Sequence, residues 1–170
     1  MNESAKIASI SQDVAAVLAE LDDLDRRILH ELQQNAAQTN LELAQKVHAS
    51  APTCLRRVKR LVDSGVIARQ VALLAPALVA RGLCAIVEIT LDNQAAEQLD
   101  KFEELVLDAP EVMQCYRVSP GPDFVLMLQV ADMPAYHALA HRLFASQTNV
   151  RNVKTYFSIK RAKFETALPL

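Results

Sequence analysis

Three glycines are all that this 170-residue chain contains, and long apolar runs are absent from it. Because glycine-rich loops hold the phosphates of nucleotides, the scarcity of glycine excludes the P-loop and dinucleotide-binding motifs. The three cysteines lie far apart without a CxxC pair, so neither a disulfide framework nor a structural zinc site is expected. No stretch of about 18 apolar residues occurs, so we expect a cytoplasmic protein without a signal peptide or membrane span.

The charge of the chain is nearly balanced, with 18 Lys and Arg against 20 Asp and Glu and a net charge of −2. It is not evenly spread. Five basic residues and one acidic residue lie between Val47 and Gln70, which gives this segment a net charge of +4. A local concentration of positive charge matters more for binding phosphates than the total for the chain. This segment is therefore the candidate contact with nucleic acid.

A pair of short helices joined by a turn is predicted for residues 40–62, after a first helix that Asp22 or Asp23 caps. Thr39 and Glu42 have the spacing of a capping box, a hydroxyl at the cap and a carboxylate three residues later. Ser50 ends the turn and caps the next helix. This arrangement is typical of a helix-turn-helix, whose second helix enters the major groove of DNA.

The second helix of this pair carries the candidate DNA contacts. A recognition helix places its N-terminal residues near base edges and its cations on phosphates. No acidic residue lies within residues 50–62 to pair with these cations, which favours DNA contact over a solvated cationic face. The residues predicted to contact DNA are Ala51, Pro52, Thr53, Arg56, Arg57, Lys59 and Arg60. Those predicted to pack inward are Leu41, Leu43, Ala44 and Val47, then Leu55, Val58, Leu61 and Val62.

We divide the chain into an extension (residues 1–20), a helix-turn-helix domain (21–75), a linker (76–83) and a C-terminal domain (84–170). Apolar residues of the extension recur at helical spacing, which fits either a helix that docks on a partner or a frayed terminus. Residues 66–74 predict a strand, and we expect the first domain to be a winged helix-turn-helix.

The C-terminal domain has the element order βαββαβ. Strands are predicted at residues 84–91, 112–118, 123–130 and 153–159, and helices at 95–107 and 133–145. The predicted fold class is α+β, with a ferredoxin-like sheet that both helices cover on one face. The other face needs cover, and a second subunit is the usual source.

The turn at residues 119–123 has two interpretations. Ser119 and Asp123 offer acceptors for an amine and Gly121 exposes backbone, whereas two prolines and a glycine also suit a rigid hairpin turn. His137 and His141 share a helix face, but no third ligand lies nearby in the sequence, which favours surface residues over a metal site. No nucleophile–base arrangement is recognisable, so no catalytic residue, metal or cofactor is assigned.

Segments along residues 21–168 follow one another in the order of a known family. The first are LDDLDRRILHELQQNAAQTNLELAQKV and CLRRVKRLVDSGVI, followed by ALLAP. The last are VEITLD, DFVLML and NVKTYFSIKR. As an ordered set they resemble the Lrp/AsnC (feast/famine) family of transcription regulators, with its recognition helix, its lead-in to the second domain and its amino-acid-sensing (RAM) domain.

This resemblance implies a regulator that binds palindromic sites in double-stranded DNA. It implies a homodimer formed through the sensing-domain sheets, with further assembly, for example into an octamer. It also implies an amino-acid or related small-molecule effector at a subunit interface. Carried over by position, the effector-binding residues are Ser119, Gly121 and Asp123 of the turn and Thr155 of the last strand.

Two alternatives from other classes remain. Siroheme decarboxylases resemble the same two-domain plan, and such an enzyme would act on a tetrapyrrole through His137, His141 and Arg142. The basic helix argues against this reading. A ligand-binding or co-regulatory module that never contacts DNA by itself is the other alternative, and it predicts no loss of function on replacing Arg57.

Overall fold

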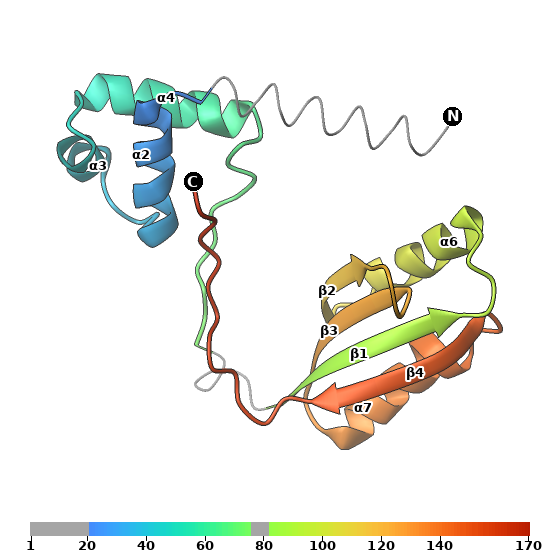
Figure 1. Cartoon of the computed structure of the whole chain (residues 1–170). Helices are drawn as coiled ribbons and strands as arrows, with labels where there is room; N and C mark the ends of the chain where they lie inside the picture. Colours follow the sequence, from blue (N-terminus) through green and yellow to red (C-terminus); the bar gives the residue numbers. More distant parts are fainter. Residues whose placement is uncertain (1–20, 76–81) are drawn as a thin grey trace. The chain divides into compact units, whose positions relative to one another are not determined.

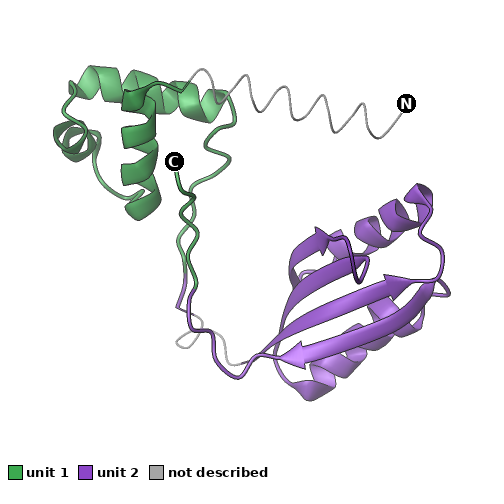
Figure 2. Ribbon diagram, in the orientation of Figure 1, with its two compact units in different colours: residues 1–73, 164–170 green, residues 74–163 purple. Residues whose placement is uncertain are grey.

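The computed structural model describes residues 21–75 and 82–170, which divide into two compact units (Figure 2). The first unit contains the described residues up to Leu73 together with Phe164–Leu170, and the second runs from Leu74 to Lys163. The extension at residues 1–20 and most of the expected linker lie outside the described residues. No helix in the described ranges is long and apolar enough to cross a membrane.

The first unit is built on three helices, α2 (Asp23–Gln34), α3 (Asn40–Lys46) and α4 (Ala51–Asp63) (Figure 1). Each begins at a polar side chain that accepts a hydrogen bond from a first-turn N–H, and these caps are Asp22, Thr39 and Ser50. At α3 the Glu42 N–H donates to Thr39 Oγ1 at 3.2 Å, and the Glu42 carboxylate accepts from the Thr39 N–H at 2.7 Å. The predicted capping box is confirmed.

The core of this unit is smaller than the sequence predicts. Its buried side chains are Ile28, Leu29, Leu43, Ala44, Val47, Cys54 and Leu61. Leu41, Leu55 and Val62 were expected inside but are 62%, 62% and 47% exposed, so the prediction is wrong at these three positions. The spacing of apolar residues predicts a wide apolar stripe on each helix. In a unit of three helices, the neighbouring helices cover only the centre of that stripe.

The predicted strand at residues 66–74 is not formed. Gly65 follows the end of α4 with a φ of 77°, and the chain then continues without regular structure. Val71, Leu73 and Leu74 are 60%, 62% and 67% exposed. A strand needs a neighbour for its N–H and C=O groups, and residues 21–75 contain no strand to provide one. The β-branched residues there favour an extended backbone, but they do not determine whether another strand lies beside it.

Residues 164–170 group with the helices rather than with the C-terminal sheet. The Gln33 side chain on α2 donates to the Leu168 carbonyl at 3.1 Å and accepts from the Leu168 N–H at 2.6 Å. This pair of bonds joins residues 135 positions apart. The chain therefore passes between the units twice, once before the first strand of the sheet and once after the last.

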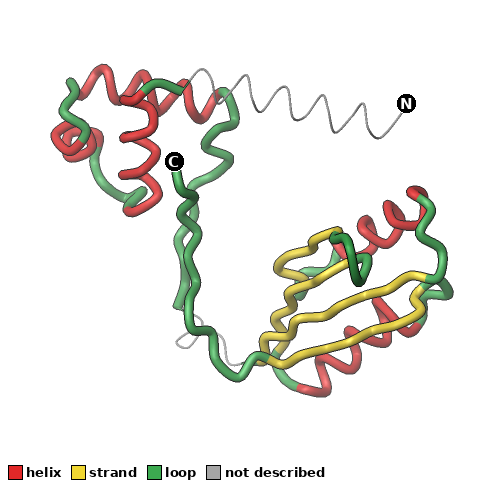
Figure 3. Tube along the Cα trace, in the orientation of Figure 1, coloured by secondary structure: helices red, strands yellow, loops and turns green. Residues whose placement is uncertain are grey.

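The second unit has the predicted βαββαβ order. Its strands are β1 (Leu83–Leu91), β2 (Val112–Arg117), β3 (Phe124–Val130) and β4 (Val150–Phe157). Its helical segments are α6 (Ala96–Leu107), α7 (Met133–Ala140) and a short π-helical turn, η1 (His141–Ala145). The strands are antiparallel in the order β2-β3-β1-β4, with α6 and α7 on one face (Figures 1 and 3). The last helix was predicted as continuous over residues 133–145, but its final turn widens.

Alternation along the central strands divides the sheet into a covered and an outer face. The covered residues Ala85, Val87, Ile89 and Leu91 of β1 and Phe124, Leu126, Leu128 and Val130 of β3 are all buried. On the outer face, Gln114, Met127, Ile86 and Tyr156 form one row across all four strands. Tyr116, Val125, Glu88 and Lys154 form the next row.

Replacing Leu126 by Ala should lower the free energy of unfolding of the second unit by about 3 kcal/mol, because it leaves a cavity in a fully buried site. Hydrogen exchange of the β1 and β3 amides in the full-length protein measures this quantity. Leu107→Ala is the matched control, since Leu107 is 68% exposed. Equal effects of the two substitutions would contradict the burial pattern.

Candidate DNA-binding and effector sites

Helix α4 starts at a tight turn that leads out of α3. His48 in this turn has a φ of 54°, and the Ser50 Oγ accepts from the Thr53 N–H at 3.3 Å. Pro52 occupies the first turn, where N–H groups have no partner within the helix. Ala51, Pro52 and Thr53 therefore form the N-terminal end of the helix, where a recognition helix meets base edges.

A buried carboxylate on α2 holds two of the arginines of α4. Asp25 is completely buried, and its Oδ2 accepts from Arg57 Nη1 at 3.1 Å and makes a shorter contact with Arg60 Nη2. Arg57 Nη1 also donates to Asp22 Oδ2 at 2.7 Å. The acids missing from α4 are thus supplied by α2. Arg57, predicted as a DNA contact, is largely covered here, since its side chain is only 22% exposed.

The pKa values in this cluster shift as its geometry requires. The pKa of Asp22 is lowered, first because its carboxylate accepts from the Asp25 N–H and then because it accepts from Arg57. The same contact with Asp22 raises the pKa of Arg57. A lowered carboxyl pKa contributes stability above the unfolded value, about pH 4, and loses it as the pH falls through the folded value.

The other two cations of α4 are placed differently. Arg56 and Lys59 are exposed, and neither forms an ion pair with any residue in the described part of the chain. They lie on the side of α4 opposite the buried Cys54 and Leu61. Of these four cations on α4, Arg57 and Arg60 are therefore paired with carboxylates, whereas Arg56 and Lys59 are not paired with a carboxylate of the described residues.

The turn between β2 and β3 is fastened to the end of β1. The Leu91 N–H donates to Asp123 Oδ2 at 2.7 Å, and the Asp123 N–H donates to the Ile89 carbonyl at 2.8 Å. Gly121 has a φ of 122°, which an L side chain rarely adopts. Asp123 therefore has a structural task that the sequence did not reveal, while Ser119 and Gly121 are exposed.

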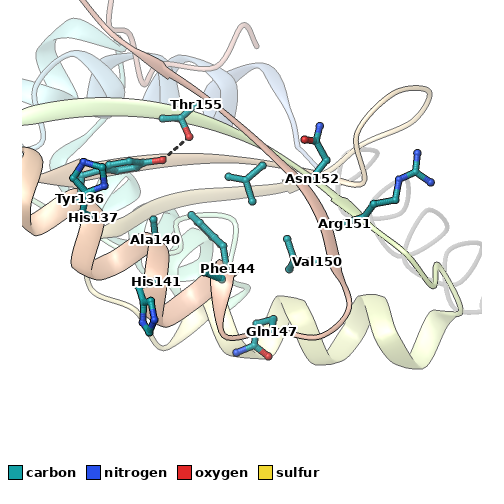
Figure 4. A pocket seen from close by; sticks show the side chains of 12 residues that line it. Tyr136, His137, Ala140, His141, Phe144, Gln147, Val150, Arg151, Asn152 and Thr155 are labelled. Atoms are coloured by element: carbon teal, nitrogen blue, oxygen red, sulfur yellow. Dashed lines mark hydrogen bonds between the residues drawn. The ribbon is translucent and has the colours of Figure 1, made fainter.

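Thr155 lies apart from this turn. It pairs with Val87 on the covered face of the sheet, and its Oγ1 is 2.6 Å from the Tyr136 hydroxyl. Both residues line a groove of about 640 Å³ between β4 and the α7–η1 segment (Figure 4). The turn residues Ser119, Gly121 and Asp123 do not line this groove. Within one chain the predicted effector residues thus form two separate groups.

The residues considered for a tetrapyrrole enzyme do not form one cluster. His137 and His141 line the groove, whereas Arg142 does not and instead bonds Glu111 at 2.9 Å. Among the described residues no group of three or more His, Cys, Asp or Glu side chains is placed to hold a metal ion.

Comparison with known proteins agrees with this geometry. The Lrp/AsnC ligand-binding domain matches residues 84–168, and a winged helix-turn-helix DNA-binding domain matches residues 21–68. An uncharacterized HTH-type transcriptional regulator of Haemophilus influenzae is 39% identical over 88% of this chain and 89% of its own length. The chain belongs to the Lrp/AsnC family.

Solved structures of transcriptional regulators have the same fold. An AsnC family regulator from Agrobacterium tumefaciens has a TM-score of 0.81 and 37% identity, covering 88% of this chain and 97% of the other. A Neisseria meningitidis regulator in complex with L-Met has a TM-score of 0.81 and 34% identity, covering 88% and 96%. The predicted family, the α+β fold class and the function as a DNA-binding transcriptional regulator are confirmed. Nothing in these relatives favours a siroheme decarboxylase.

Replacing Asp123 by Asn should speed hydrogen exchange at the Leu91 amide at least tenfold, because a charged acceptor of that N–H becomes neutral. Exchange measured by NMR on the full-length protein reports this local opening. Asp92→Asn, an exposed carboxylate next to Leu91, serves as the control. An unchanged Leu91 rate would show that the turn is held without the Asp123 carboxylate.

Proposed function

We propose that α4 enters the major groove of a palindromic operator with Ala51, Pro52 and Thr53 nearest the base edges. Arg56 and Lys59 then neutralise phosphates on either side of the groove. The observation that carries this proposal is that these two cations are exposed on the outer side of α4 and have no acidic partner among the described residues. We also expect the protein in the cytoplasm, because a DNA-binding regulator must reach the chromosome.

The outer face of the sheet is the surface through which two copies would pair. Ile86 and Met127 are only partly covered at its centre, and Tyr116 and Tyr156 beside them are 51% and 42% exposed. Because both helices cover the opposite face, neither of them shields these side chains. A symmetric dimer would bury them and present two copies of α4 about 34 Å apart, the spacing of successive major grooves.

An amino acid or related small molecule would modulate this dimer. Support comes from the family match to a ligand-binding domain and from the L-Met complex of the Neisseria regulator. A relative from Zymomonas mobilis, 36% identical over 91% of this chain, is named a glutamate uptake regulatory protein. Ser119, Gly121 and Asp123 would meet Thr155 of another protomer, because one protomer keeps the two groups apart. The effector would act by binding one assembly more tightly than another.

The double substitution Arg56→Gln/Lys59→Gln should reduce the slope of log affinity against log salt by about 2 for each α4 bound, and so by about twice that for a dimer on its operator, since each phosphate contact contributes about 0.9. Titration of genomic fragments selected by the native protein, at several salt concentrations, measures the slope. Lys101→Gln/Lys163→Gln removes the same charge from the second unit and should leave the slope unchanged. An unaltered slope in the first variant would remove both residues from the interface.

Replacing Ile86 by Asp should convert the dimer into monomers at micromolar concentration, because it places a charge at the centre of the proposed interface. Sedimentation equilibrium gives the mass directly. Leu107→Asp, on an exposed position of α6, is the control and should remain dimeric. A dimer that survives Ile86→Asp in a folded protein would place the interface elsewhere.

A further inference from the structure

Asp25 is the one charged side chain that is fully buried among the described residues. Its Oδ2 accepts from the Asp22 N–H at 3.2 Å, which closes the N-terminal cap of α2. The same oxygen accepts from Arg57 and Arg60, which are 32 and 35 positions away on α4. One carboxylate thus joins the start of α2 to the middle and end of the recognition helix.

We propose that Asp25 is a positioning residue for DNA recognition, which fixes the setting of α4 and withholds Arg57 and Arg60 from the phosphates. This inference rests on the proposed entry of α4 into the major groove. It divides the basic helix into two working pairs. Arg56 and Lys59 contact DNA. Arg57 and Arg60 fix α4 in the orientation that lets Arg56 and Lys59 reach the phosphates.

The geometry explains why the two held arginines stay where they are. To reach a phosphate, each guanidinium would have to leave a carboxylate that is sealed from water. An uncompensated charge at that buried position is strongly unfavourable. Arg57 is held most firmly, because Asp22 adds a second carboxylate and the side chain is 22% exposed. For Arg56 and Lys59 a phosphate adds an anionic partner. For Arg57 and Arg60 a phosphate only replaces the carboxylate with which each already pairs.

The consequence is a limit on charge-driven binding. Each cation that moves from Asp25 to a phosphate would release counterions from any DNA, whatever its sequence. By holding two cations back, Asp25 lowers non-specific affinity and leaves a larger share of the binding to contacts at the start of α4. A buried ion pair with a purely structural role would stabilise the helices without this effect on salt dependence.

The first test compares Arg60→Gln with Arg56→Gln, a matched pair one turn apart on the same helix. Each full-length variant is titrated with a random-sequence duplex at several salt concentrations. We expect Arg56→Gln to lower the slope of log affinity against log salt by about 0.9 for each α4 that contacts the duplex and Arg60→Gln to leave it unchanged. A loss of this size in both variants would overturn the proposal but not the function. No loss in Arg56→Gln would overturn the proposed function itself.

The second test is Asp25→Asn, which keeps an acceptor for the α2 cap but frees the two arginines of their charged partner. We expect the salt slope to steepen by 1 to 2 units, as about one or two new phosphate contacts form. The ratio of affinities for a selected genomic fragment and the random duplex should fall at least tenfold. Asp23→Asn, an exposed carboxylate in the same turn, should change neither quantity.

Circular dichroism at the assay temperature establishes that Asp25→Asn is folded. A folded Asp25→Asn protein with the native slope and the native affinity ratio would show that Asp25 is only structural, which overturns the proposal. If this variant does not fold, the Arg56 and Arg60 pair decides the question without it.

Discussion

The buried Asp25 carboxylate and its two arginines are the contact on which the DNA-binding unit depends. The three helices bury seven apolar side chains, and Asp25 of α2 is buried together with them. A charged group at that place needs partners of opposite charge, because an unpaired buried carboxylate is strongly disfavoured. Arg57 and Arg60 satisfy this need from α4, so the position of the recognition helix is set by an ion pair as well as by packing.

The second unit is organised by a different constraint, the alternation of a four-stranded antiparallel sheet. One face is filled by β-branched, leucine and phenylalanine side chains under α6 and α7, and the other carries Ile86, Met127 and two tyrosines without cover from its own unit. The turn after β2 is not loose, because Asp123 ties it to β1. Two chain connections join this unit to the helices, since residues 164–170 return to α2.

Membership of the Lrp/AsnC family establishes the general role, and the chain's own residues refine it. A single run of positive charge in α4 becomes two pairs with different surroundings. The residues assigned to effector binding become two groups, one in a fastened turn and one beside Tyr136 in a groove. The second division is the reason for our proposal that the effector site is completed between protomers.

The sequence by itself determined the features that depend on near neighbours. The caps at Asp22, Thr39 and Ser50 and the βαββαβ order all follow from interactions over a few residues, and all were predicted. Only the tertiary structure decided which distant residues meet. The strand expected at 66–74 is not formed, Leu41 and Leu55 are mostly exposed, and Asp25 contacts Arg60, which is 35 positions away. The type of a residue determines whether it needs burial or a partner of opposite charge, but only the tertiary structure determines which residues provide them.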